Sequence, residues 1–321
     1  MAEILKQISN MGLVPVVVLE DAEKAVPVAK ALQRGGIDCA EVTFRTAAAE
    51  ASIRNITEEC PEMLVGAGTV LSVEQVKSAV RAGAKFIVTP GYNPKVVNYC
   101  VENNIPIVPG CMDTNAIEMA LEAGLDTVKF FPAEPAGGVE MLKALAGPYT
   151  TLKFMPTGGV NQDNLKEYLA FRKVVACGGS WMVKGDLIAN DRYDEIESRS
   201  REAIMQMLDF HVTHVGINCE SEAEAEKNAA SLDCLFGFAR DPKNSSVFAG
   251  KSIEITKTKM PGSHGHIAIG VSDVERAVYY LSKKGVEFDL ENAKYKGGRM
   301  SSVYLKKEIA GFAFHLVDDV R

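Results

Sequence analysis

The chain has 321 residues, enough for two domains or one large domain, and its 47% hydrophobic and 24% charged residues are ordinary for a globular protein. The formal net charge is −7, and the longest basic runs are the pairs Lys283-Lys284 and Lys306-Lys307, so we expect no nucleic-acid partner. No apolar run approaches the roughly 20 residues of a membrane span, so we expect no membrane association.

The cysteines are scattered along the chain without a CxxC pair, at positions 39, 60, 100, 111, 177, 219 and 234. This usage indicates reduced thiols in a cytoplasmic protein rather than a disulfide framework or a cysteine zinc site. Residues 1–6 lack a basic region followed by an apolar stretch and a cleavage site, so we expect no signal peptide.

Short apolar segments recur along the first 210 residues, each rich in β-branched residues or ending in Gly or Pro. They are residues 14–20, 39–45, 64–70, 86–91, 105–111, 127–133, 152–160 and 174–180. Amphipathic helical stretches lie between them, for example at 21–35, 72–82 and 93–103. Strands alternating with helices favour a parallel sheet, and eight such units favour an α/β fold of the compact TIM (β/α)₈ barrel type.

Lys129 lies in the sixth segment, among residues that the pattern assigns to the barrel core. Desolvation disfavours the ammonium form of a lysine, and a neutral amine facing a cleft can attack a ketone and form a Schiff base. Lys129 therefore indicates covalent chemistry on a carbonyl substrate. The alternative is a lysine that extends from a strand end into solvent.

Glu41, Thr43 and Arg45 alternate along the second segment, so we expect them on one strand face. A carboxylate near a neutral lysine can shuttle protons, and an arginine on the same face can hold a substrate carboxylate through two parallel hydrogen bonds. The alternative is a Glu–Arg ion pair that closes the end of the barrel.

Glycine-rich turns end the seventh and eighth segments, at residues 157–159 (Thr-Gly-Gly) and 178–180 (Gly-Gly-Ser). Barrels often bind phosphate with the loops after these two strands, where glycines let backbone N–H groups approach the anion. The turns therefore indicate a phosphate site; alternatively, the glycines only permit tight connections.

Five motifs in this order resemble the KDPG/KHG aldolases, which are 2-dehydro-3-deoxy-phosphogluconate and 4-hydroxy-2-oxoglutarate aldolases. The motifs are residues 41–46 (Glu-Val-Thr-Phe-Arg-Thr), 65–71 (Val-Gly-Ala-Gly-Thr-Val-Leu), 129–134 (Lys-Phe-Phe-Pro-Ala-Glu), 156–160 (Pro-Thr-Gly-Gly-Val) and 178–181 (Gly-Gly-Ser-Trp). The resemblance covers nearly all of residues 1–205. It implies a class I aldolase that works without a metal cofactor and forms a homotrimer.

The resemblance also implies a role for each matched residue. Lys129 is the expected Schiff-base lysine, and Glu41 is the expected general acid and base. The expected substrate-binding residues are Arg45 and Thr69 at the carboxylate, Pro90 and Phe131 at the pocket wall, and Thr157, Gly158, Gly159, Gly179 and Ser180 at the phosphate. The implied substrates are 2-oxo acids that release pyruvate with glyceraldehyde 3-phosphate or with glyoxylate. A phosphogalactonate-type aldolase is an alternative from the same barrel group.

The chemistry of the chain changes near residue 211. All the histidines, at positions 211, 214, 264, 266 and 315, lie after residue 210. We therefore expect one domain at residues 1–210 and another at 211–321.

The second domain contains a weak repeat. In its first half, residues 214–218 precede a helical stretch at 222–235 and a strand-like segment at 251–256. In its second half, residues 266–270 precede a helical stretch at 273–284 and a strand-like segment at 302–317. Two β-α-β-β units of this kind resemble the glyoxalase-like, or vicinal oxygen chelate, superfamily.

That resemblance places metal ligands at His214, Glu254, His266 and His315. The fourth position is commonly glutamate in the superfamily, so His315 departs from the pattern. Three imidazoles and one carboxylate suit zinc, nickel or iron(II), which makes a divalent metal the possible cofactor of this domain. Three alternatives remain open: a bifunctional enzyme with metal-dependent activity, a metal-free fold that senses a small molecule, and a module that assembles subunits.

Overall fold

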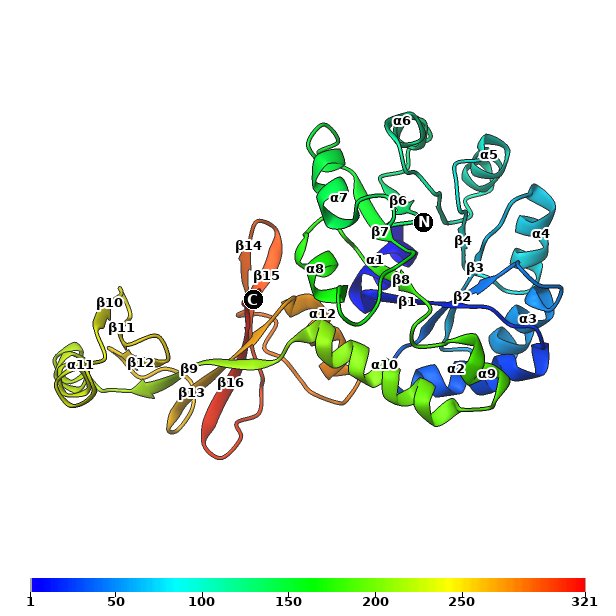
Figure 1. Ribbon diagram of the computed structural model, residues 1–321. Coiled ribbons are helices and arrows are strands. Elements are labelled where there is room, and N and C mark those ends of the chain that lie inside the picture. The colour runs from blue at the N-terminus through cyan, green and yellow to red at the C-terminus, as the bar shows by residue number, and fades with distance from the viewer. Residues whose placement is uncertain (1, 321) are drawn as a thin grey trace. The chain divides into compact units, whose positions relative to one another are not determined.

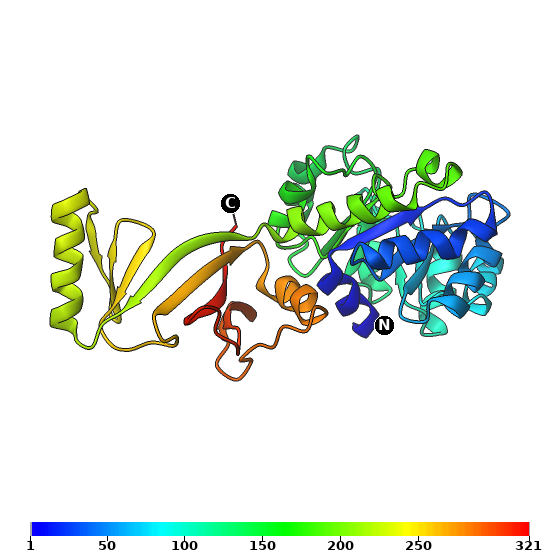
Figure 2. The same ribbon diagram turned by 90° about the horizontal axis from the view of Figure 1, so that it is seen from below.

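The computed structural model describes residues 2–320. The chain divides between Met207 and Leu208 into two compact units, and this division lies just before the predicted boundary after residue 210. Figures 1 and 2 show a strand-and-helix unit first and a sheet-rich unit second.

The first unit contains strands that are all parallel to their sheet neighbours (Figure 1). The strands are β1 Leu13–Val17, β2 Cys39–Thr43, β3 Leu64–Gly68, β4 Phe86–Val88, β5 Ile107–Val108, β6 Thr127–Phe130, β7 Lys153–Pro156 and β8 Cys177–Gly179. Each overlaps one of the predicted apolar segments but is shorter. The α/β class and the order of the strands are therefore confirmed.

The strands pair in chain order. One sheet runs β5-β4-β3-β2-β1-β8, and β6 pairs with β7. Isolated bridges join the two groups: Gly110 to Lys129 between the fifth and sixth strand regions, and Phe154 to Val174 and Thr157 to Gly178 between the seventh and eighth. Every strand region thus borders both of its neighbours around a ring, as the predicted barrel requires.

Helices surround these strands in Figures 1 and 2. They are α1 Ala2–Met11, η1 Ala22–Lys24, α2 Ala25–Arg34, α3 Ala49–Glu59, α4 Val73–Arg81, α5 Pro94–Glu102, α6 Thr114–Glu122, α7 Gly138–Ala146, α8 Leu165–Ala170, α9 Gly185–Ala189 and α10 Tyr193–Leu208. Side chains cap several N-termini, since Ser72, Asn93 and Asp113 each accept a backbone N–H of the first turn. The predicted helices at 21–35, 72–82 and 93–103 are confirmed.

The strands of the first unit have continuous apolar sequences because both of their faces are buried in its core. β1, β2 and β3 are buried at every position, because helices cover one face of the sheet and the opposite face lines the interior of the ring. Phe86, Phe130 and Phe154 are among the largest fully buried side chains. Two charged residues, Lys129 and Glu41, share this buried environment.

The second unit is one mixed sheet in the order β10-β11-β12-β9-β13-β16-β15-β14. Its elements are β9 His211–Asn218, α11 Glu222–Phe236, β10 Arg240–Pro242, β11 Ser246–Ala249, β12 Ile253–Thr256, β13 Gly265–Val271, α12 Val274–Ser282, β14 Lys294–Lys296, β15 Arg299–Tyr304 and β16 Phe312–Asp318. α11 packs on β10, β11 and β12, and α12 packs on β15 and β16 (Figure 2).

The two halves of this sheet have the same connectivity. Each runs strand, helix and three strands, and the antiparallel pairing of β9 with β13 joins the halves. The predicted β-α-β-β count is therefore wrong by one strand in each half. The apolar pattern does not indicate β10 and β14, because they are short edge strands, exposed at every position and rich in charged residues. The predicted segments also omit β11, a mostly buried strand of four residues.

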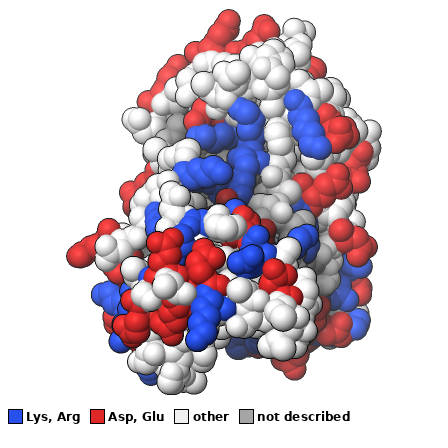
Figure 3. All heavy atoms as spheres, turned by 90° about the vertical axis from the view of Figure 1, so that its left-hand side faces the viewer, with Lys and Arg blue, Asp and Glu red and all other residues white. Residues whose placement is uncertain are grey.

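Within residues 2–320, none of the helices combines the length with the apolar composition that a membrane-spanning helix requires. On the face drawn in Figure 3, Lys and Arg side chains lie among Asp and Glu side chains.

Candidate functional site

A buried ion pair lies inside the first unit. The Nζ atom of Lys129, on β6, is 3.2 Å from Oε1 of Glu41, on β2. The two residues are 4% and 0% exposed, so Lys129 does not extend into solvent as the alternative reading required. Strands β2 and β6 are not neighbours in the sheet, so the two side chains meet across the interior of the ring.

Glycine at position 68 leaves the space that the Glu41 carboxylate occupies. A Cβ atom on Gly68 would lie 1.9 Å from Glu41 Oε1 and 2.5 Å from Cδ. β3 pairs with β2 in register, with Thr43 opposite Gly68, so the backbone is fixed on both sides of this contact. The sequence motifs give Gly68 no role, although a glycine at the end of an apolar strand is a signal of close approach.

Arg45 and Thr69 lie side by side, since Arg45 Nε donates a hydrogen bond to Thr69 Oγ1 at 3.1 Å. The prediction that Arg45 shares a strand face with Glu41 is wrong, because β2 ends at Thr43 and Arg45 lies exposed in the following turn. Thr69 adopts a φ of 51°, which is strained for a β-branched residue. Such strain concentrates at ligand sites.

A pocket of about 240 Å³ opens beside this group. Apart from Val16, Val18 and Val160, the residues that line it belong to the predicted substrate set: Arg45, Phe131, Thr157, Gly158, Gly159, Gly179 and Ser180. The Nζ atom of Lys129 is 5.5 Å from the centre of the Phe131 ring, which connects the buried pair to the pocket wall.

Pro90 lies just past β4, and Gly110 connects it to the site. A Cβ atom on Gly110 would lie 2.2 Å from the Pro90 carbonyl oxygen, and Gly110 also bridges to Lys129. The structure therefore brings every residue predicted for the aldolase site to one end of the strands, where barrels carry their active sites.

The turn after β7 has the backbone that a phosphate site needs. Gly158 and Gly159 have φ values of 93° and 88°, which residues with a Cβ rarely adopt. Within the described chain, the buried Thr157 hydroxyl has no hydrogen-bond partner. The turn thus places glycine backbone and one unpaired hydroxyl at the pocket.

A second cluster lies in the second unit, where four predicted ligands converge. His214 Nε2 is 3.3 Å from His266 Nε2, and both atoms approach Glu254 Oε2, at 3.2 and 3.0 Å. One nitrogen each of His214, His266 and His315 lies within 4.8 Å of the others. β9, β12, β13 and β16 supply one residue each.

Hydroxyl groups orient two of these rings. Nδ1 of His214 contacts Thr213 Oγ1 at 3.3 Å, and Nδ1 of His315 contacts Ser302 Oγ at 3.2 Å, so Nε2 of each ring turns toward the cluster. His315 Nε2 is buried and, among the described residues, unpaired. Burial and the nearby histidines lower the pKa of His315 to about 3, so its imidazole stays neutral at pH 7. Burial opposes ionisation of Glu254, but hydrogen bonds with His214 and His266 outweigh it and lower its pKa.

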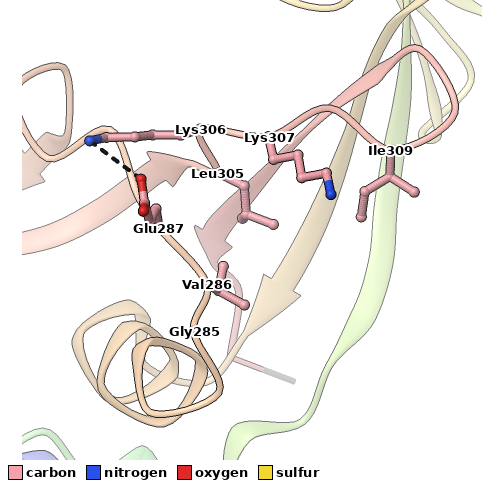
Figure 4. A pocket seen from close by; sticks show the side chains of 7 residues that line it. All are labelled: Gly285, Val286, Glu287, Leu305, Lys306, Lys307 and Ile309. Carbon is pink, nitrogen blue, oxygen red and sulfur yellow. Dashed lines mark ion pairs between the residues drawn. The ribbon is translucent and has the colours of Figure 1, made fainter.

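A further pocket, of about 550 Å³, lies elsewhere in the second unit (Figure 4). Val286, Leu305 and Ile309 form its apolar lining. Beside them, Nζ of Lys306 lies 3.8 Å from Oε2 of Glu287. None of the residues that line it belongs to the predicted sites.

Known proteins resemble the first unit. The family described as KDPG and KHG aldolase matches residues 4–199. The 2-dehydro-3-deoxy-phosphogluconate aldolase of Treponema pallidum (strain Nichols) is 49% identical over 204 residues, which are 64% of this chain and 97% of that protein. The KHG/KDPG aldolase of Escherichia coli (strain K12) is 43% identical over 192 residues, or 60% and 90% of the two chains.

A solved structure agrees with these relatives. The crystal structure of KDPG aldolase from Legionella pneumophila, with pyruvate captured as a covalent carbinolamine, has a TM-score of 0.61 and 36% identity. It covers 62% of this chain and 97% of its own. Because the family match spans most of the first unit and more than half of the whole sequence, the chain belongs to the KDPG and KHG aldolase family.

Proposed function

We propose that the first unit is a class I aldolase, a lyase that splits 2-oxo acids through a Schiff base on Lys129. Its substrates are 2-dehydro-3-deoxy-6-phosphogluconate (KDPG), which gives pyruvate and glyceraldehyde 3-phosphate, and 4-hydroxy-2-oxoglutarate, which gives pyruvate and glyoxylate. The observation that carries this proposal is the buried Lys129–Glu41 pair at 3.2 Å beside a glycine-lined pocket. No metal or organic cofactor takes part.

The pair supplies both groups that imine formation requires. Glu41 takes a proton from Lys129, and the neutral amine attacks the C2 ketone to form a carbinolamine. Glu41 then returns a proton to the C2 hydroxyl, which leaves as water and gives the protonated imine. Burial of both side chains keeps this exchange between two groups rather than with bulk solvent.

Carbon–carbon cleavage follows from the imine. Glu41 accepts the proton of the C4 hydroxyl, the C3–C4 electron pair moves into the imine, and the aldehyde leaves. Glu41 returns this proton to C3 of the resulting enamine, and water hydrolyses the imine to release pyruvate and Lys129. The Glu41 Oε2 atom has no hydrogen-bond partner among residues 2–320, so it is available for the C4 hydroxyl.

The two ends of the substrate bind to different groups. Arg45 and Thr69 hold the carboxylate that all the substrates share. Pro90 and Phe131 form the wall beside the reacting carbons. The phosphate of KDPG is held by the glycine-rich turns, through Thr157, Gly158, Gly159, Gly179 and Ser180. 4-Hydroxy-2-oxoglutarate lacks that phosphate and uses the first end alone. A phosphogalactonate-type substrate differs only in configuration at C4, and rates with both epimers distinguish the two.

The test is borohydride reduction in the presence of pyruvate, followed by mass spectrometry of the intact chain and its peptides. We expect one reduced pyruvyl adduct, on Lys129. The Lys129→Arg variant is the matched control and should carry none. A folded wild-type protein without an adduct would overturn the proposal.

The resemblance to the KDPG/KHG aldolases also supports a cytoplasmic homotrimer. Sedimentation of the full chain tests the oligomeric state.

For the second unit we propose a divalent metal site made of His214, Glu254, His266 and His315. The carrying observation is the unpaired, buried Nε2 of His315, which faces two other imidazoles and a carboxylate. Neutral imidazoles and one carboxylate suit zinc, nickel or iron(II), and the hydroxyls of Thr213 and Ser302 fix two of the rings as outer-sphere groups do. A bound ion would supply Lewis acidity for a second, glyoxalase-like activity.

Metal analysis of the purified full chain tests this site. We expect about one equivalent of metal in the wild type and loss of most of it in His315→Ala, with the borohydride adduct on Lys129 unchanged. His264→Ala is the matched control, because His264 lies in the same unit but outside the cluster. Wild-type protein that binds no zinc, nickel or iron(II) would leave a metal-free ligand sensor or a subunit-assembly module.

A further inference from the structure

The turn at residues 157–160 is held from outside by residues that do not line the pocket. The backbone N–H of Glu134 donates to the Gly158 carbonyl at 3.0 Å. The side-chain amides of Asn161 and Asn164 both donate to the Gly159 carbonyl at 3.1 Å. Two successive carbonyls are thus fixed on the side of the turn that faces these residues.

Peptide geometry converts this anchoring into a direction for the donors. In a trans peptide the C=O and N–H bonds point in opposite directions. The N–H groups of Gly159 and Val160, which share peptides with the two anchored carbonyls, therefore point away from Glu134 and the asparagines. Both residues line the pocket of about 240 Å³, and in the described chain neither N–H has a hydrogen-bond partner.

Glu134 also fixes the turn through its side chain. A Cβ atom on Gly159 would lie 2.5 Å from both Cβ and Cγ of Glu134, so the two residues are in close contact. The carboxylate accepts a hydrogen bond from the hydroxyl of Tyr168, which lies on α8 and is fully buried. Burial and this hydrogen bond to Glu134 raise the pKa of Tyr168, so its hydroxyl remains a donor at any working pH.

We propose that Glu134, held by Tyr168, is a positioning residue for substrate phosphate. It sets the backbone of the turn, and with it the enzyme's preference for a phosphorylated over an unphosphorylated substrate. Neither side chain touches the reacting carbons. The inference rests on the proposed phosphate role of residues 157–160 and assigns the control of that role to residues outside the pocket.

The test compares KDPG with 2-dehydro-3-deoxygluconate, which differs from it only in lacking the phosphate. For each variant we measure the ratio of kcat/KM for the two substrates. Loss of the hydrogen bond with which Tyr168 holds the Glu134 side chain against the turn corresponds to a three- to tenfold smaller ratio, in order of magnitude. We expect that decrease in Tyr168→Phe and Glu134→Ala, from a higher KM for KDPG, with kcat/KM for the unphosphorylated substrate within about twofold of wild type.

Two variants separate positioning from charge and from general damage. Glu134→Gln keeps an acceptor for Tyr168 and removes the negative charge, so its ratio should stay within about twofold of wild type. Glu102→Ala, at the end of α5, removes an exposed carboxylate remote in sequence from the turn and should behave as wild type. A larger ratio in both Glu134 variants would mean that the carboxylate acts by repelling phosphate, which overturns the inference.

The outcomes also separate this inference from the proposed function. A wild type without preference for KDPG would refute the phosphate role of the turn, and the positioning role with it. A clear wild-type preference that Tyr168→Phe and Glu134→Ala both retain would refute only the positioning role. Tyr168→Phe removes a single oxygen and keeps the buried ring, so it remains informative if Glu134→Ala fails to fold.

Discussion

Replacing Gly68 with alanine should inactivate the aldolase through Glu41. The new Cβ would lie 1.9 Å from Oε1 and 2.5 Å from both Cδ and Cγ of Glu41, so small adjustments of the carboxylate cannot relieve the overlap. The β3 backbone is held in register by β2, so the glutamate must rotate away from Lys129. Insertion of a methyl group into a packed core costs about 1–3 kcal/mol, and loss of a positioned acid/base group costs about 10²- to 10⁴-fold in rate.

The assay is release of pyruvate from KDPG, followed in a coupled reaction, together with the free energy of unfolding. We expect kcat to fall about 10²- to 10⁴-fold in Gly68→Ala. The Glu41→Ala background removes the three atoms that lie nearest to the new methyl group, which are Oε1, Cδ and Cγ of Glu41. In that background, Gly68→Ala should change the free energy of unfolding by no more than about 0.5 kcal/mol, and the activation free energy of the residual reaction by no more than the same amount.

The double-mutant cycle tests whether positions 68 and 41 act through their mutual contact. A Gly68→Ala enzyme with the kcat of wild type would show that Glu41 either moves without loss or is not the acid/base group. An equal loss of rate in the wild-type and Glu41→Ala backgrounds would show that position 68 acts through something other than Glu41.

Three further predictions concern charge and metal. Lys129→Met should abolish the pyruvyl adduct and lower the unfolding free energy by about 3–5 kcal/mol, because it leaves Glu41 buried without its partner; urea unfolding and mass spectrometry check both. In metal-free protein, the pKa of His315 is about 3 in the folded state and about 6.5 in the unfolded state, so only the unfolded chain binds a proton between these pH values. The free energy of unfolding should therefore decline by about 1.4 kcal/mol per pH unit as the pH falls from about 6.5 toward 3. Far-ultraviolet dichroism follows this loss, Trp181 fluorescence reports the first unit separately, and His315→Gln should flatten the profile. A chelator should lower the melting temperature of the second unit only, by the equivalent of about 3 kcal/mol for an ion at 100 times its Kd, and a pyruvyl adduct that disappeared with it would contradict the assignment of separate sites.

The sequence predicts the strands of the first unit well because their burial on both faces leaves unbroken apolar runs. It overestimates their lengths, since a run such as 105–111 continues into the loop while β5 pairs only at Ile107–Val108. Lys129 and Glu41 stand out because charged residues in such runs are rare. The contacts that position them were not predictable, because Gly68 meets Glu41 only through the pairing of β3 with β2.

Support for the phosphate turn was unpredictable for the same reason. Glu134 and Tyr168 are separated by 34 positions, and neither residue type at its own position indicates a partner. From the sequence alone, Tyr168 is expected to be an ordinary core residue, and Glu134 is expected to be an exposed loop residue. Only the folded chain shows that the first anchors the second, so local patterns identify the atoms that meet a ligand better than those that orient them.

The second unit shows how a repeated fold produces an unequal site. In the first half, His214 is followed two residues later by Gly216, which pairs with Glu254, which pairs with Phe248. In the second half, His266 is followed by Ala268, which pairs with His315, which pairs with Tyr304. Glu254 and His315 therefore occupy equivalent positions, as do Phe248 and Tyr304.

This equivalence gives the departure at His315 a physical consequence. Two carboxylates at these positions would neutralise a divalent ion, whereas one carboxylate with three neutral imidazoles leaves a net charge of +1. Tyr304 stacks on the His315 ring with centres 4.6 Å apart, and Phe248 meets the His214 ring edge-on at 5.5 Å. A loaded site of this kind would attract an anion more strongly than its two-carboxylate counterpart, so replacement of His315 with glutamate should weaken anion binding while it preserves metal binding.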